Sequence, residues 1–198
     1  MASDSGVIRG SDAKDRCYWC DGSADYRAYH DGEWGGPVAD DIYLFEKICL
    51  DGFQSGLSWL TILKKRSAFR AAFADFEVDR VAAFGPADID RLLADSGIIR
   101  NRLKIEATTE NARRIQALRQ SHGSFVDWLE MHHPRSQEEW TRLFRQTFRF
   151  TGGQIVNEFL MSLGYLPGAH EPDCPVFARI LKHSPPWARA PAPAPAGV

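Results

Sequence analysis

Long apolar segments are missing from this 198-residue sequence. No apolar run approaches the roughly 18 residues that a membrane-spanning helix needs, so no such helix is expected. The opening residues, MASDSGVIRGSDAKD, have no apolar stretch of the kind found in secretory signals. Internal repeats and abrupt changes of composition are also missing, so nothing marks a repeat architecture or a domain boundary. We therefore expect a cytoplasmic protein without membrane association.

Cysteine and net charge are both scarce. The four cysteines favour reduced thiols or metal ligands over a disulfide framework in a cytoplasmic chain. The formal net charge of −2 gives no general sign of a polyanionic partner. The first 51 residues hold 11 acidic and 5 basic side chains, a charge of −6, so the remainder carries +4. An anion-binding face is therefore expected in the later part of the chain.

Apolar residues recur at helical spacing along most of the chain. A chain of 198 residues with 44% hydrophobic content can bury about 70% of its unfolded surface without metal or disulfides. We predict an all-α domain of about eight helices over residues 15–183. Residues 1–14 and the Pro/Ala-rich residues 184–198 are predicted to be solvated tails. FRFTG, at 148–152, is the one strand-like segment.

Capping residues locate the predicted helices. Serine side chains accept hydrogen bonds from the first free amides of a helix, and glycine commonly ends one. Ser136 and Glu139 have the spacing of a reciprocal capping box. Helix starts are predicted near Asp40, Ser58, Pro86, Ser124 and Ser136, and helix ends near Gly97, Gly123 and Gly164.

Possible metal ligands gather at both ends of the chain. Cys17, Cys20 and His30 lie near its start, and His170 and Cys174 near its end. Two ligands from each end would form a closed tetrahedral Cys2His2 zinc site. Such an ion would close a very long loop, worth about 4.7 kcal/mol for a 100-residue loop in the disulfide analogue, and would leave no position for substrate. A redox CxxC pair and five unrelated side chains remain alternatives.

The segment LADSGIIRNRLKI, at 93–105, has the pattern of a helix-hairpin-helix. In that motif, amides of the turn and the start of the second helix face a DNA phosphate. The candidate DNA contacts are Gly97, Ile98, Arg100, Arg102 and Lys104. A capped helix followed by a solvated basic turn would produce the same pattern.

Large aromatic residues concentrate in the first third of the chain. Such rings serve either as core residues or as a stacking pocket. The candidates are Trp19, Tyr26, Tyr29, Trp34 and Trp59. Asp51 comes directly after the apolar residues Cys49 and Leu50, near the end of a predicted helix. It is either an acid of the pocket or an exposed residue at the helix end.

Five segments together resemble the DNA-3-methyladenine glycosylase I family of the helix-hairpin-helix superfamily. YHDGEWG, LFEKICLDG, SGLSW, LKKR and SGIIRNRLKI occur in the expected order, and the resemblance runs from Cys17 to Cys174. It implies a helix-hairpin-helix glycosylase fold with one structural zinc ion that joins the N- and C-terminal segments. The implied ligands are Cys17, His30, His170 and Cys174, which leaves Cys20 outside the site.

The resemblance also implies a function. A damaged base would leave the duplex and enter a pocket formed by the five aromatic residues, beside the catalytic Asp51. The family has glutamate where this chain has Asp51, and glutamine is typical where it has Phe53. The implied reaction is excision of 3-methyladenine as the free base from alkylated double-stranded DNA, by hydrolysis of the N-glycosidic bond in base excision repair. Because the sequence has no apolar surplus, a small enzyme of this kind is expected to be a monomer. No motif positions a lysine for strand cleavage, and Asp127 is predicted to be a surface residue.

Two other functions fit parts of the pattern. A non-catalytic helix-hairpin-helix module would bind damaged DNA without releasing a base, consistent with the shorter acid at position 51. A zinc hydrolase acting on a small molecule would need water in place of one of the four ligands.

Overall fold

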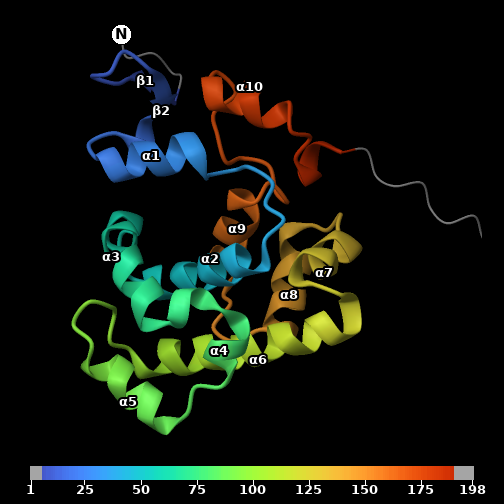
Figure 1. Ribbon diagram of the computed structural model, residues 1–198. Helices are drawn as coiled ribbons and strands as arrows, with labels where there is room; N and C mark the ends of the chain where they lie inside the picture. The colour runs from blue at the N-terminus through green and yellow to red at the C-terminus, as the bar shows by residue number, and fades with distance from the viewer. Residues whose placement is uncertain (1–5, 190–198) are drawn as a thin grey trace, which may run out of the picture.

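The computed structural model describes residues 6–189, which are mostly helical (Figure 1). Within that range, no helix is both long and apolar enough to cross a membrane. The elements in chain order are β1 (Val7–Arg9), β2 (Asp15–Cys17), η1 (Tyr18–Cys20), α1 (Ala24–Gly32), α2 (Asp41–Gln54), α3 (Trp59–Ala72), η2 (Ala74–Phe76), α4 (Val78–Ala82), α5 (Pro86–Ala94), α6 (Arg102–His122), α7 (Phe125–His132), α8 (Gln137–Thr147), α9 (Gly153–Ser162), α10 (Pro175–Leu181) and η3 (Pro186–Ala188).

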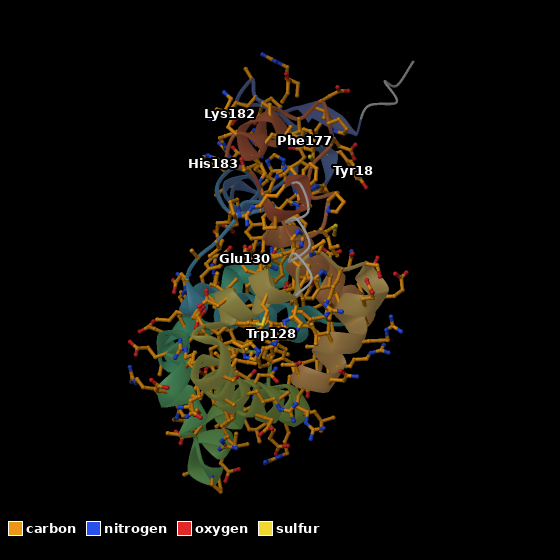
Figure 2. All side chains as sticks on the ribbon, turned by 90° about the vertical axis from the view of Figure 1, so that its right-hand side faces the viewer. Tyr18, Trp128, Glu130, Phe177, Lys182 and His183 are labelled. Atoms are coloured by element: carbon orange, nitrogen blue, oxygen red, sulfur yellow. The ribbon has the colours of Figure 1, made fainter. Side chains whose placement is uncertain are left out.

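The two ends of the chain meet at one end of the molecule. Helix α10 lies beside β1, β2 and α1 in Figure 1, whereas α2 to α9 form the larger body. Figure 2 shows Tyr18 and Phe177 both at that smaller end, with Trp128 in the body. The N- and C-terminal segments therefore form one unit that caps the helical body.

The predicted capping residues begin the helices as expected. Ser58 Oγ accepts a hydrogen bond from the amide of Thr61 at the start of α3. Ser124 caps α7 in the same way, and Ser136 and Glu139 form the reciprocal capping box of α8. Each cap is worth about 1 kcal/mol, so these ends are fixed by local sequence.

Helix α2 forms the centre of the body, with contacts to α3, α6, α7 and α9. Its buried residues include Leu44, Phe45, Ile48 and Leu50, each worth about 1.5–3 kcal/mol on burial. Phe53 belongs to this core, because its ring lies 4.7 Å from that of Phe69 between centroids. Packing on several sides makes α2 a rigid support for the polar residues that it carries.

The predicted N-terminal tail is wrong for the described part of residues 1–14. Strand β1 pairs with β2 in antiparallel register, with Val7 opposite Cys17. Arg16 is 5% exposed, and its guanidinium binds the carboxylates of Asp12 and Asp31. Backbone pairing and ion pairs thus order a segment that has few apolar residues. A prediction from hydrophobic periodicity does not detect these interactions. Residues 1–5 lie outside the described range.

Two further predictions differ from the structure. FRFTG forms no strand: Phe148 is buried in the core and Phe150 has a left-handed φ of 57°. The C-terminal segment continues into η3, where Trp187 stacks on Phe177 with centroids 6.1 Å apart. The rest of the predicted tail, residues 190–198, lies outside the described range. Short helices α1, α4 and α10 were not predicted.

Candidate active site and metal centre

The four predicted metal ligands lie together. The ligand atoms of Cys17, His30, His170 and Cys174 are all within 4.8 Å of one another, and all four residues are buried. His170 Nδ1 lies 3.2 Å from His30 Nε2 and 3.7 Å from Cys17 Sγ, while Cys174 Sγ lies 3.6 Å from His30 Nε2. The expected Cys2His2 cluster that joins the two terminal segments is therefore confirmed.

Four different elements position this cluster. Cys17 ends β2, His30 lies on α1, His170 is in the loop after α9, and Cys174 precedes the first residue of α10. Each imidazole also binds an acceptor through its other nitrogen. His30 Nδ1 lies 2.8 Å from an Asp31 carboxylate oxygen, and His170 Nε2 lies 2.8 Å from the Trp34 carbonyl. Such outer contacts orient histidine ligands at metal sites.

Burial acts on the ionisation of these groups. It raises the pKa of the Cys17 thiol to about 12 and lowers the pKa of His170 to about 4. Neutral imidazoles are the form that binds metal, whereas a buried thiolate needs a nearby positive charge. Cys20 does not belong to the cluster: its thiol contacts the Cys17 carbonyl at 3.2 Å, and burial raises its pKa to about 11. The donor set thus suits a soft or borderline divalent cation.

A pocket of about 330 Å³ lies between the capping unit and the body. All five predicted aromatic residues and Asp51 line it. They come from η1, α1, the loop after α1, α2 and the first turn of α3, so the pocket exists only when both parts of the fold are in place. The remaining lining residues are Lys47, Gln54, Glu158, Met161, Gly168 and Ala169.

The aromatic rings form a continuous wall. Trp19 lies 5.9 Å from both Tyr26 and Trp34, and Tyr29 lies 5.8 Å from Trp34 and 5.4 Å from Trp59, all between ring centroids. Trp34 is fixed by a 2.6 Å hydrogen bond from its Nε1 to the Ala169 carbonyl. The structure thereby brings the predicted pocket rings together. A planar aromatic ligand can stack against such a wall.

Three polar atoms of this wall have no hydrogen-bond partner among the described residues. They are the Tyr29 hydroxyl, Trp59 Nε1 and Asp51 Oδ2, all buried. A buried unpartnered polar group costs about 1–3 kcal/mol, so three around one pocket are unusual outside a binding site. Asp51 is 2% exposed, which excludes the alternative of an exposed helix end. Burial raises the pKa of Asp51 to about 6, opposed by the nearby Lys47.

Lys47 is one of six pocket residues that sequence reasoning missed, and it is the one that contacts Asp51. Its Nζ forms a buried ion pair with Asp51 Oδ1 and lies 4.3 Å from the centroid of the Trp59 ring. Lys47 and Asp51 are four residues apart on α2 and so share one face of that helix. That spacing was the available signal. Glu158, from α9, is a third ionisable group in the pocket, and burial raises its pKa.

The predicted hairpin forms between α5 and α6, but its residues divide into two groups. Arg100 and Arg102 are exposed, with Arg102 paired to Asp90 and Glu106. The Gly97 amide is already bound to Asp95 Oδ1 at 2.7 Å, and Ile98 is 3% exposed. Among the described residues Arg100 has no ion-pair partner and presents a free charge, whereas the exposed charge of Arg102 is shared with two acids.

Lys104 does not fit its predicted role at the hairpin. The side chain is 8% exposed, and Nζ donates hydrogen bonds to the carbonyls of Phe53 and Ser55 at the end of α2. Burial also lowers its pKa. Lys104 therefore ties α6 to the end of α2 and is removed from the candidate phosphate contacts.

Known proteins have sequences similar to that of this chain. The methyladenine glycosylase family model matches residues 19–142. DNA-3-methyladenine glycosylase 1 of Escherichia coli (strain K12) is 39% identical over 169 residues, covering 76% of this chain and 90% of the relative. DNA-3-methyladenine glycosylase of Haemophilus influenzae is 38% identical over 81% of this chain and 96% of the relative.

A solved structure agrees with these sequence relationships. The crystal structure of a 3-methyladenine DNA glycosylase I variant in complex with 3-methyladenine has a TM-score of 0.75 at 33% identity, covering 81% of this chain and 96% of that one. On these grounds, the chain belongs to the methyladenine glycosylase family.

Proposed function

We propose that this protein is a DNA-3-methyladenine glycosylase that excises 3-methyladenine from alkylated double-stranded DNA in base excision repair. The observation that carries the proposal is the pocket, where aromatic rings line a cavity that holds three buried unpartnered polar atoms, one of them on the acid Asp51. A relative of this family is known in complex with 3-methyladenine. A flipped purine is read by stacking and by hydrogen bonds to its edge, and this pocket offers both.

Cleavage of the N-glycosidic bond of 3-methyladenine needs little assistance from the protein. Methylation at N3 makes adenine a cation, so the base leaves as a neutral molecule when its bond to the sugar breaks. Stacking on aromatic side chains returns about 1–3 kcal/mol per base, against a few kcal/mol for flipping. Asp51 accepts a hydrogen bond from the base edge while water attacks C1′ of the sugar. The products are free 3-methyladenine and an abasic site, with no strand cleavage.

The Cys2His2 cluster fits zinc, and we assign it a structural role. Tetrahedral bonds of about 2.1 Å to nitrogen and 2.3 Å to sulfur separate the ligand atoms by about 3.3–3.8 Å. The contacts of 3.2, 3.6 and 3.7 Å in the cluster are close to these values. Four protein ligands leave no position for substrate, so the ion would hold the capping unit together and take no part in hydrolysis.

DNA contact is assigned to Arg100 and Arg102, which project from the hairpin. Phosphate contacts of this kind set position and orientation without reading sequence. The aspartate at position 127 is exposed and belongs to the Ser124 cap of α7, which keeps it away from the proposed chemistry. We expect the protein to act as a monomer in the cytoplasm.

The proposed function is tested by incubating purified protein with duplex DNA treated with a methylating agent. Released bases are then separated and identified by mass spectrometry, and the strands are examined for breaks. The expected result is free 3-methyladenine and intact strands that break only after alkaline treatment. Tight binding to the same DNA without any released base would instead favour a non-catalytic damage-binding module.

A further inference from the structure

The pocket already contains a positive charge of its own. The Lys47 ammonium lies 4.3 Å from the centroid of Trp59, 5.7 Å from that of Trp34 and 5.9 Å from that of Tyr29. It therefore makes with the pocket rings the same kind of cation–π contact that a cationic base would make. A pocket that selected its base by cation–π attraction alone would not place a lysine there.

The donors of this ammonium are only partly used. An ammonium has three N–H groups, and within residues 6–189 the hydrogen bond from Lys47 Nζ goes to Asp51 Oδ1. The other oxygen of the same carboxylate, Oδ2, has no partner among those residues. Lys47 and Asp51 thus form one polar pair that presents a free donor beside a free acceptor.

Resting on the proposed function, we propose that Lys47 is a specificity-determining residue that, with Asp51, reads the base edge and selects amino purines over oxo purines. An adenine edge carries an exocyclic amino donor next to a ring-nitrogen acceptor. Asp51 Oδ2 accepts from the amino group, and Lys47 Nζ donates to the ring nitrogen. A guanine presents two adjacent acceptors at the corresponding edge, one of which would face the Asp51 oxygen.

The charges in the pocket are compatible with a cationic base. Asp51 balances Lys47 within the buried pair, and Glu158 adds a second acid to the lining. Asp51 is one methylene shorter than glutamate, so its carboxylate reaches less far into the pocket. The Lys47 ammonium supplies a second polar group on the same side of the pocket. The pair thus combines the acceptor of the family's glutamate with a donor of its own.

Two substitutions of similar length separate a hydrogen-bond role from a charge role. Lys47→Met removes the charge and the donor, whereas Lys47→Gln removes the charge but keeps an N–H donor. Lys182→Met is the matched control, because Lys182 is exposed beyond the end of α10. Release of 3-methyladenine and 3-methylguanine is measured from the same methylated DNA, with thermal melting to confirm that each variant folds.

We expect Lys47→Met to lower kcat/KM for 3-methyladenine roughly 10- to 100-fold, the range for a lost hydrogen bond to a charged group. Its release of 3-methylguanine should fall less, so the ratio of the two rates drops, and Lys47→Gln should restore part of the ratio. Lys182→Met should match the wild type. An unchanged ratio, or equal losses for both bases, would overturn the proposal.

Titration of the free bases keeps this test independent of catalysis. Quenching of pocket tryptophan fluorescence by 3-methyladenine and by 3-methylguanine reports binding without DNA. If the wild type released no base, the proposed function would fail, yet a Lys47-dependent preference for 3-methyladenine would still support edge reading. Because Lys47→Met strands Asp51 without its counter-charge, binding is repeated at pH 9, where a protonated Asp51 would ionise again. Full recovery of the preference at that pH would assign the effect to Asp51 and overturn a direct role for Lys47.

Discussion

At Asp51, burial on folding favours the neutral carboxyl group, whereas the proposed function needs the carboxylate. Burial raises its pKa from 3.8 to about 6 in the folded protein. Between those values the folded state binds a proton that the unfolded state has released, so this group's contribution to stability falls as pH rises from about 4 to 6. Near neutral pH the protein therefore holds a carboxylate in an apolar place, and the ion pair with Lys47 offsets part of that cost.

The raised pKa of Asp51 predicts the pH dependence of base excision. Because a protonated Asp51 accepts the base edge poorly, kcat/KM should rise with pH and level off above about 6. Asp51→Asn should lower kcat/KM at least about 10-fold and remove this acid limb. Asp127→Asn is the control, since the exposed Asp127 should leave the profile unchanged. Initial rates of 3-methyladenine release across pH 5–8 measure it, and an acid limb that persists in Asp51→Asn would refute the assignment.

The chemistry of single residues was predictable where a motif fixed it. The five aromatic residues and the four metal ligands could be named because the sequence resembles a known family, whereas residue types and spacing alone left core packing and unrelated side chains as alternatives. Lys47 and Lys104 could not be placed in this way. A lysine on an amphipathic helix usually extends into solvent, and only tertiary contacts show that both of these ammonium groups point inward.

At the scale of single elements, the turn before α3 connects a cap to the pocket. Ser58 caps the helix whose first residue is Trp59. Ser58→Ala should cost about 1 kcal/mol of unfolding free energy and, by loosening Trp59, also lower kcat/KM. Ser124→Ala removes the cap of α7 and should cost a similar free energy with unchanged kcat/KM. Urea denaturation and excision assays on both variants check this, and equal kinetic losses would contradict it.

The hairpin gives a second prediction at this scale. Each arginine that neutralises a phosphate should contribute about 0.9 to the slope of log affinity against log salt concentration. Arg100→Ala and Arg102→Ala should each reduce that slope by about this amount, measured by fluorescence anisotropy on abasic duplex. Lys104→Met should leave the slope unchanged while lowering stability, because its Nζ binds the carbonyls at the end of α2. A smaller slope in Lys104→Met would return Lys104 to the DNA face.

Elements were predictable in proportion to their local signals. Helices α3, α5, α7 and α8 have a cap or a proline at the start, and these boundaries follow from the sequence. Helix α1 has only Tyr29 and His30 buried, so it lacks an apolar stripe. Strands β1 and β2 have three residues each, and their pairing depends on the capping unit that surrounds them. The elements that were not predicted are stabilised by contacts between segments that are distant in the sequence.

For the whole molecule, the decisive feature is that the pocket has walls from two parts of the fold. Lys47, Asp51 and Glu158 belong to the body, while Trp19 and Tyr29 belong to the capping unit. The capping unit has a small core of its own around Cys17, Cys174, Val176 and Ile180. So few apolar residues cannot hold it firmly, and a bound ion would supply the missing stability.

Loss of the metal should therefore open the pocket without unfolding the body. Cys174→Ser removes one ligand of the cluster, and Cys20→Ser, a buried thiol outside it, is the matched control. Zinc measured by mass spectrometry should be one ion per chain in the wild type and in Cys20→Ser, and far below one in Cys174→Ser. Hydrogen exchange should then rise across β1, β2, α1 and α10 while α2 and α6 stay protected, and excision should be lost because Trp19 and Tyr29 no longer close over Asp51. A Cys174→Ser protein that kept full zinc and activity would show that the four side chains meet for packing alone.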